Sequence, residues 1–149
     1  MTFEFVTEQN IDIAATIHSI SWKESHKSFC SEEFILAHTP QRQKKYIENE
    51  IIDGKRFYIL YDDNSAKGIV SIKNNLIENL YVLPSEQRKG YGTELLKYAE
   101  QLCKGTPTLW ILSNNEAAKM LYTKMNYKFT GNKKFLNTKL QELEMVLSE

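Results

Sequence analysis

The first candidate for a chemical role in this chain is the glycine turn from Gln87 to Gly92, Gln-Arg-Lys-Gly-Tyr-Gly. This turn follows an apolar, β-favouring segment, Ile77 to Leu83, and it opens a segment from Tyr91 to Cys103 that has the apolar period of a helix. A turn between a strand and a helix N-terminus leaves backbone N–H groups free, and these groups and the helix dipole attract anions, most often phosphate. The glycine turn therefore predicts a cradle for a pyrophosphate.

The side chains of the glycine turn agree with an anion site. Gly90 and Gly92 carry no Cβ atom, so phosphates could lie directly against the main chain. Arg88 and Lys89 add positive charge. Neither standard nucleotide motif fits, because the dinucleotide fingerprint needs a third glycine where this chain has Leu95, and the P-loop needs a lysine directly after its last glycine.

The elements that must position the turn follow from apolar periods and turn signals. Strands are expected at 3–6, 56–61, 68–72, 77–83, 108–112, from 127 and at 143–147, and helices at 8–22, from 31 with a restart at 39–40 and an end at 53–54, at 91–104 and after 114. The order β-α-α-β-β-β-α-β-α-β-β predicts an α+β sandwich around a mostly antiparallel sheet. One parallel pair is expected in it, with the helix that begins at Tyr91 as the crossover.

Length and composition limit the class of protein. The chain has 149 residues, enough for one domain over 1–149 with a sizeable core. Its 19 basic and 19 acidic residues cancel, which argues against a nucleic-acid or membrane surface. The longest apolar run, Phe57 to Tyr61, is too short for a membrane span, no signal peptide is visible, and Cys30 and Cys103 are too few for a disulfide framework. We therefore expect a cytoplasmic protein.

A second segment, C-terminal to the glycine turn, adds a further pattern to be interpreted together with it. Thr108 to Leu112 has the pattern of another buried strand, and residues 114–129 continue with Asn, a short helix containing Leu-Tyr-Thr-Lys and a turn into a further strand. The spacing Gln/Arg-x-x-Gly-x-Gly after an apolar strand, followed by this segment, resembles the acetyl-CoA signature of the GNAT superfamily of N-acetyltransferases over residues 77–130. One departure is visible, since family members usually have Gly-Phe where this chain has Asn126-Tyr127. Asn is also common at a left-handed helix C-cap, so the turn geometry is kept.

The resemblance implies a GNAT-type fold, in which helices flank a mixed, mostly antiparallel sheet. Its parallel strands 4 and 5 splay apart to admit the pantetheine arm of acetyl-CoA, which is the expected co-substrate, with no metal. The backbone around Val82 would pair with pantetheine and supply the donor for the oxyanion. The implied cofactor-binding residues are Leu80, Tyr81, Val82, Gln87, Arg88, Lys89, Gly90, Tyr91, Gly92, Thr93 and Asn115. Asn114 could replace Asn115, and a helix N-cap is the other role open to this pair.

Two residues are candidates for catalysis under the resemblance. Acetylation of an amine needs removal of a proton, because an alkylamine has a pKa near ~10.4, and it needs a proton for the leaving thiolate. Tyr122 stands where the family has its general acid, and packing against the sheet is its alternative role. Glu78 stands where many relatives have a base, and a solvated residue at a strand end is the alternative. The implied reaction is direct attack of the amine on the thioester in a ternary complex, without an acyl-enzyme.

The histidines and the acceptor complete the sequence-based expectations. His18, His26 and His38 share no metal-ligand spacing, so we interpret all three as surface or core imidazoles, although His26 lies where the family walls its acceptor pocket. The expected acceptor is an amine of a small molecule or a peptide, and no sequence pattern identifies it further. A homodimer is left open. Two other functions remain as alternatives: a non-catalytic acyl-CoA-binding sensor domain, and another phosphate-ligand binder such as a nucleotide enzyme.

Overall fold

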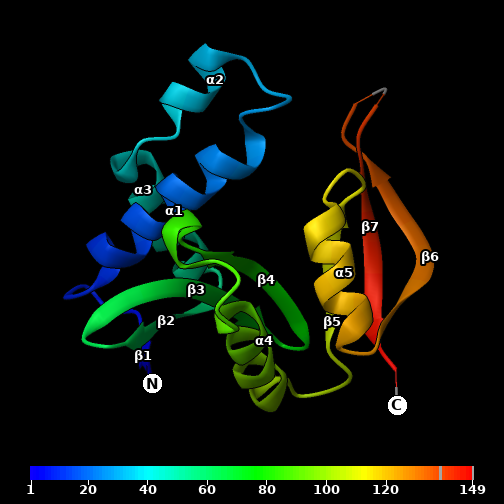
Figure 1. Cartoon of the computed structure of the whole chain (residues 1–149). Helices are drawn as coiled ribbons and strands as arrows, with labels where there is room; N and C mark the ends of the chain where they lie inside the picture. Colours follow the sequence, from blue (N-terminus) through cyan, green and yellow to red (C-terminus); the bar gives the residue numbers. More distant parts are fainter. Residues whose placement is uncertain (138, 149) are drawn as a thin grey trace.

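A computed structural model describes residues 1–137 and 139–148 of the chain (Figure 1). The elements, in chain order, are β1 (Thr2–Phe5), α1 (Ile11–His26), α2 (Glu32–Ala37), α3 (Pro40–Ile52), β2 (Arg56–Asp62), β3 (Ser65–Lys73), β4 (Leu76–Val82), the 3₁₀ turn η1 (Pro84–Glu86), α4 (Tyr91–Leu102), β5 (Thr108–Leu112), α5 (Glu116–Lys124), β6 (Tyr127–Phe135) and β7 (Gln141–Leu147). Among these residues, no helix combines the length and the apolar character that crossing a membrane requires.

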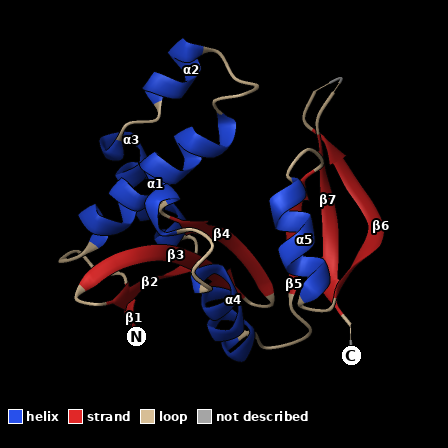
Figure 2. Cartoon of the chain, viewed as in Figure 1, coloured by secondary structure: helices blue, strands red, loops and turns tan. Residues whose placement is uncertain are grey.

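The strands form one mixed sheet in the order β1-β2-β3-β4-β5-β7-β6, with helices on its faces (Figure 2). The pairing of β4 with β5 is parallel, and the other described pairs are antiparallel. Helix α4 makes the crossover that a parallel pair needs. The α+β fold class and the parallel pair predicted from the sequence are confirmed.

Two apolar cores lie on opposite faces of the sheet because neighbouring residues of a strand point to opposite sides. On β3, Val70 belongs to the core that α4 covers with Leu95, and Ile69 belongs to the core that α1 and α3 cover with Ile17 and Ile47. All five side chains are buried. This packing holds α1 and α3 over one face of β4, and α4 over the other.

The first helix departs from its expected bounds, whereas α2 and α3 lie where the sequence predicted them. A helix was predicted over 8–22, whereas α1 runs from Ile11 to His26. Asn10 explains the later start, because its side chain accepts a hydrogen bond from Thr7 N–H (2.8 Å) and donates to Phe5 O (3.0 Å), which holds residues 7–10 in a turn. His26 therefore lies in the last turn of α1 and not in the connection to α2.

The parallel strands separate soon after they meet. β4 and β5 share one paired position, Leu76↔Thr108, and beyond it they diverge (Figure 1). From there on, β5 pairs on its other side with β7, from Thr108↔Val146 to Leu112↔Glu142. The splayed strands expected from the resemblance are confirmed, and the facing edges of β4 and β5 are left without a strand between them.

Candidate functional site

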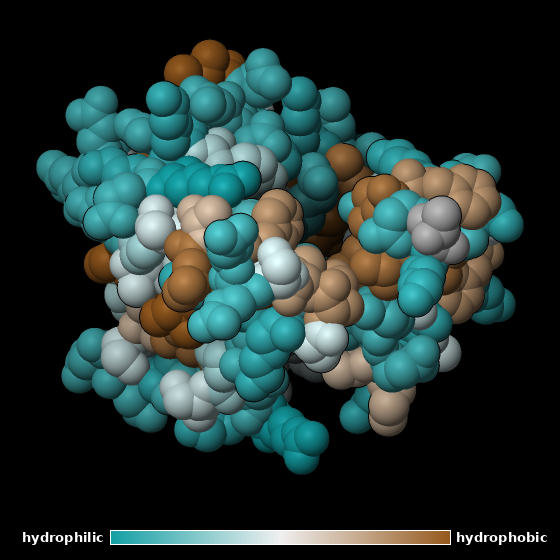
Figure 3. All heavy atoms as spheres, turned by 90° about the horizontal axis from the view of Figure 1, so that it is seen from above, coloured by the Kyte–Doolittle hydropathy of each residue, from teal (hydrophilic) through white to brown (hydrophobic). Residues whose placement is uncertain are grey.

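A cleft of about 1090 Å³ passes between the splayed strands. Its walls come from α1, α3, β4, the glycine turn, β5, α5 and the β6–β7 end, and the view from above shows a hollow with hydrophobic side chains between the two masses of the molecule (Figure 3). The residues proposed from the sequence that line it are Glu78, Leu80, Tyr81, Val82, Gln87, Arg88, Gly90, Tyr91, Gly92, Thr93, Asn114, Asn115 and Tyr122. The fold thus gathers nearly all of them in one place.

The glycine turn has the backbone shape of an anion cradle. Gly90 is the N-cap of α4 with φ 90°, and Arg88 also has a positive φ of 65°. Lys89 does not line the cleft, and its Nζ pairs with Glu86 Oε2 at 3.1 Å. Of the two basic side chains expected beside the phosphates, only Arg88 faces the cleft.

A β-bulge in β4 changes which backbone groups face the cleft. Glu78 pairs with Ser71 and Tyr81 with Ile69, so between these pairs β4 has one residue more than β3. Asn79, in this stretch, has a φ of 50°, a left-handed conformation that Asn tolerates. Along a strand, successive peptide groups point alternately toward the neighbouring strand and away from it. The extra residue in β4 shifts this alternation by one position relative to β3.

The shifted alternation leaves the peptide groups of Val82 free of β3. Leu83 N–H donates to Lys67 O at 2.9 Å, which makes Leu83 and Lys67 a hydrogen-bonded pair. The next pair, Gly68↔Val82, is therefore a non-hydrogen-bonded pair, and the N–H and C=O of Val82 point to the side of β5. Gln87 Nε2 donates to Val82 O at 3.2 Å, so the glycine turn is tied to the same peptide.

Tyr122 brings a phenol from α5 into this cleft. Its side chain is 8% exposed and lies 5.9 Å, ring to ring, from Tyr127. Burial raises the pKa of Tyr122 to about 12, so the phenol stays protonated at neutral pH. The ring packs in the core under α5 while the residue lines the cleft, so the two roles weighed for Tyr122 are compatible.

Of the two asparagines before α5, Asn115 caps the helix. Asn115 is the N-cap of α5, and its Oδ1 accepts a hydrogen bond from Ala118 N–H at 3.0 Å. The N-cap expected for one of this pair is confirmed, and the amide nitrogen of Asn115 is not used by the cap. Both residues line the cleft.

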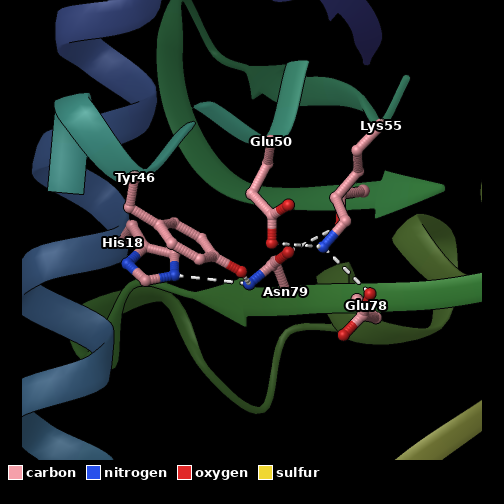
Figure 4. Close-up of polar contacts among 7 residues, drawn as sticks. His18, Tyr46, Glu50, Lys55, Glu78 and Asn79 are labelled. Atoms are coloured by element: carbon pink, nitrogen blue, oxygen red, sulfur yellow. Dashed lines mark hydrogen bonds and ion pairs between the residues drawn. The ribbon is translucent and has the colours of Figure 1, made fainter. Parts of the chain in front are cut away.

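Glu78, the candidate base, has a cationic partner in the structure. Its side chain is 40% exposed, and Oε1 lies 2.9 Å from Nζ of Lys55, which is 5% exposed. Lys55 also pairs with Glu50 Oε1 at 3.1 Å (Figure 4). Glu78 is therefore a partly exposed carboxylate with a buried cationic partner, and a cost of burying it unpaired does not arise.

Beside this ion pair, Asn79 joins three elements through its side-chain amide. Its Oδ1 accepts from Ser71 Oγ at 2.7 Å, and its Nδ2 donates to His18 Nε2 and to Tyr46 Oη, both at 3.4 Å (Figure 4). Because Nε2 of His18 accepts, the proton of the neutral ring lies on Nδ1, which is buried and has no partner among the described residues. His18 is the core imidazole expected from the sequence, and it also lines the cleft.

The wall near α2 is aromatic. Trp22 is stacked between the imidazoles of His26, with centroids 3.9 Å apart, and His38, at 3.5 Å, while the ring of Phe34 lies 5.6 Å away. His26 and His38 thus act as packing partners of Trp22. Within residues 1–137 and 139–148, no group of three or more His, Cys, Asp or Glu side chains is arranged to hold a metal ion.

The sequence analysis did not name Tyr46, Lys55 or Asn79, and it gave His18 a core role but no part in the cleft. Two of them carry a signal in the sequence. Asn79 interrupts a β-favouring segment with a residue that strands disfavour, which is typical of a bulge. His18 is a polar residue beside Ile11, Ala14 and Ala15 on the buried face of α1.

The buried imidazole of His18 predicts a loss of stability in acid. Burial, with smaller contributions from nearby His38, His26 and Lys55, lowers the pKa of His18 to about 4, below the 6.5 of an exposed imidazole. The stabilisation is therefore present above pH 6.5 and is lost as pH falls toward 4, by about 2–3 kcal/mol. Denaturant unfolding at pH 7 and pH 4 should show a smaller acid loss for His18→Gln than for wild type. An equal acid loss in both proteins would contradict this assignment.

Comparisons with known proteins agree with this geometry. The profile of the family described as "Acetyltransferase (GNAT) domain" matches residues 53–129. PaiA N-acetyltransferase from Thermoplasma acidophilum, solved in complex with coenzyme A, is 22% identical with a TM-score of 0.75, and the alignment covers 97% of this chain and 98% of that one. YncA from Salmonella typhimurium, solved with acetyl-CoA, is 19% identical with a TM-score of 0.70, covering 99% and 93%.

A third structure, a GCN5-related N-acetyltransferase from Rhodopseudomonas palustris, is 19% identical with a TM-score of 0.73, covering 99% of this chain and 95% of that one. At these identities the likeness shows a common fold. No curated protein sequence gives a significant match to the chain.

Proposed function

Because this chain belongs to the GNAT acetyltransferase domain family, we propose that it transfers the acetyl group of acetyl-CoA to a primary amine of a small molecule or a peptide. The observation that carries the proposal is a cleft lined together by the glycine turn, by Val82, whose peptide faces away from β3, and by Tyr122. The relatives solved with coenzyme A and acetyl-CoA support the choice of donor. We extend the proposal to residues 1–149 acting as one cytoplasmic domain.

The residues of the cleft have distinct proposed roles toward acetyl-CoA. Backbone N–H groups of the glycine turn and Arg88 bind the pyrophosphate. The exposed edge of β4 at Leu80, Tyr81 and Val82 pairs with the pantetheine arm as an added strand would, and Asn115 adds its amide N–H. These contacts place the thioester at the end of the splay, where the amine enters from the wide side.

The proposed chemical step uses three residues that line the cleft: Val82, Glu78 and Tyr122. We propose that the amine attacks the thioester directly and that Val82 N–H stabilises the oxyanion. Glu78 takes the proton of the acceptor amine, directly or through water. Tyr122 hydrogen-bonds the sulfur and donates a proton as the thiolate leaves.

The test of the function is turnover. Release of free thiol from acetyl-CoA should be measured over a panel of polyamines, amino acids, aminoglycosides and peptides with free N-termini, with acetylation confirmed by mass. Acetylation of at least one class supports the proposal. Binding of CoA without transfer to any amine would instead favour an acyl-CoA sensor, and stabilisation by ATP or NAD but not by CoA would favour a nucleotide ligand.

A glycine substitution tests the cradle. At a hundredfold excess over Kd, acetyl-CoA should stabilise wild type by ~2.7 kcal/mol, because it binds the native state alone. A Cβ at Gly92 would stand at the start of α4, 3.3 Å from a methyl group of Leu121, and would occupy space that the phosphates need. For Gly92→Val, a hundredfold weaker Kd leaves ~0.4 kcal/mol of that stabilisation. Thermal shift with and without acetyl-CoA measures this difference.

The control for Gly92→Val is Gly105→Val, in the loop after α4, where the nearest neighbour of a Cβ would be 4.0 Å away. This variant should keep the full ligand-induced shift. Gly90 is the poorer test, because a side chain at φ 90° strains the apo backbone itself, although no atom lies within 4 Å. An unchanged shift in Gly92→Val would remove the cradle assignment.

A further inference from the structure

The ion pairs of Lys55 form a cluster of three charges beside the cleft: Lys55, Glu50 and Glu78 (Figure 4). Glu50 is a local partner, since it lies five residues earlier in α3 and its carbonyl oxygen accepts a hydrogen bond from Lys55 N–H at 3.0 Å. Glu78 is a distant partner on β4. The lysine therefore joins the end of α3 to the strand that flanks the cleft.

The two carboxylates of this cluster are not equivalent. Glu50 alone balances the buried charge of Lys55, so the second carboxylate is not needed to neutralise it, and the cluster carries a net negative charge. Of the two, Glu78 lines the cleft, whereas Glu50 does not. The excess negative charge therefore belongs to the carboxylate that an approaching amine would meet.

The contact also orients that carboxylate. Lys55 Nζ holds Oε1 of Glu78 at 2.9 Å, and the close-up shows Oε2 directed away from the lysine (Figure 4). Oε2 is thus the oxygen left for an ammonium group or a water. A carboxylate fixed by one oxygen loses side-chain freedom before the substrate arrives, which reduces the entropy cost of binding and catalysis.

The other titratable groups around Glu78 do not replace Lys55 as its cation. Burial opposes the charge of Lys55, but the hydrogen bond to Glu78 and the further interactions with Tyr46 and Glu50 raise its pKa above the ordinary value, so it stays charged. Tyr46 on α3 and Tyr81 on β4 have pKa values raised by burial and remain neutral. His18 on α1, with its lowered pKa, is neutral as well.

We propose that Lys55 is a positioning residue of the acetyl-transfer reaction, a buried ammonium that acts through Glu78 by fixing its carboxylate at the acceptor end of the cleft. This inference rests on the proposed function. It requires that Lys55 affect the reaction of the acceptor amine and leave the binding of acetyl-CoA unchanged. It also requires that the effect of Lys55 disappear when Glu78 can no longer act.

A double-mutant cycle tests this dependence. Lys55→Gln keeps hydrogen-bond donors near both carboxylates but removes the charge, and kcat/KM for the amine should fall about tenfold or more in the wild-type background. In the Glu78→Gln background the same substitution should change kcat/KM less than about twofold. The acid side of the pH–rate profile of Lys55→Gln should move to higher pH, because loss of the neighbouring cation disfavours the carboxylate. The KM for acetyl-CoA should not change.

Glu50→Gln is the matched control. It removes the other partner of Lys55 and leaves the Lys55–Glu78 pair, so kcat/KM and the pH profile should stay within about threefold of wild type. If Lys55→Gln does not fold, Lys55→Arg takes its place in the same cycle, since it keeps the charge but displaces it from Oε1. Thermal unfolding of each variant monitors the fold.

The outcomes separate the two proposals. A wild type that acetylates no amine overturns the proposed function and this inference with it. An active wild type whose Lys55 and Glu78 substitutions multiply independently overturns the inference alone, because Lys55 would then act elsewhere or only through stability. Two further results would count against Lys55 as a positioning residue. One is a pH–rate profile of Lys55→Gln that does not move, and the other is a loss of kcat/KM in Glu50→Gln as large as that in Lys55→Gln.

Discussion

Tyr122→Phe should lower kcat by about 10²–10⁴-fold, the usual contribution of a positioned general acid. The buried ring is kept, whereas the hydroxyl of this cleft-lining residue is lost. Because burial raises the pKa of Tyr122 to about 12, the phenol is a donor throughout the neutral range, and loss of activity should not depend on pH below about 9. Single-turnover kinetics with a good amine, together with the Kd of acetyl-CoA, separate the chemical step from binding.

Tyr127→Phe provides the control for this variant. Tyr127 is the neighbouring buried phenol, its hydroxyl donates to Glu100 Oε2 at 2.8 Å, and it does not line the cleft. Loss of its hydroxyl should reduce stability by about 1.5–3 kcal/mol, the contribution of one hydrogen bond to a charged group, and leave kcat unchanged. A fall of less than a few-fold in Tyr122→Phe, on an amine whose chemistry limits the rate, would assign the proton to water or to another residue.

Glu78→Gln should lower kcat/KM at neutral pH by about 10²-fold or more and should regain part of that loss at high pH. Activity should recover at high pH because of the acceptor amine. An alkylamine with a pKa near ~10.4 is almost wholly protonated at pH 7 and needs a base, whereas at a pH above its pKa it is already neutral. The substitution keeps the shape of the side chain and its contact with Lys55. The pH–rate profiles of both proteins, from acid to alkaline pH, measure the recovery.

A structural role for Glu78 predicts a different result. Thermal stability or acceptor binding would fall, and the profile of Glu78→Gln would be the wild-type curve multiplied by a constant. That outcome would remove Glu78 from proton transfer and leave a water chain or binding of the neutral amine. Glu50→Gln belongs in the same series, because it perturbs Lys55 without touching the cleft.

The features that could be predicted without the structure are those set by residues close together in the chain. Gly90 at the N-cap of α4 and the apolar stripe behind it require a turn and a helix in that order, whatever the rest of the chain does. The same local logic predicted that one of Asn114 and Asn115 caps the next helix, and it predicted a strand over 77–83 before the turn, where β4 runs from Leu76 to Val82. With the crossover rule, these local patterns indicated the α+β class and the parallel pair, whereas the splay of the two strands was expected only from the resemblance to the GNAT superfamily.

The tertiary structure alone decided which side chains meet. Glu78 gains its cation from Lys55, 23 positions earlier, and Asn79 meets His18 across 61 positions. Lys89, which the sequence predicted beside the phosphates, pairs with Glu86 in the structure. No local propensity encodes such pairs, because they depend on how α1 and α3 pack on β4 and on a bulge that shifts its backbone pairing by one residue. The proposed acceptor end of the cleft is built from these long-range contacts, and for that reason the sequence named fewer of its residues than of the proposed acetyl-CoA end.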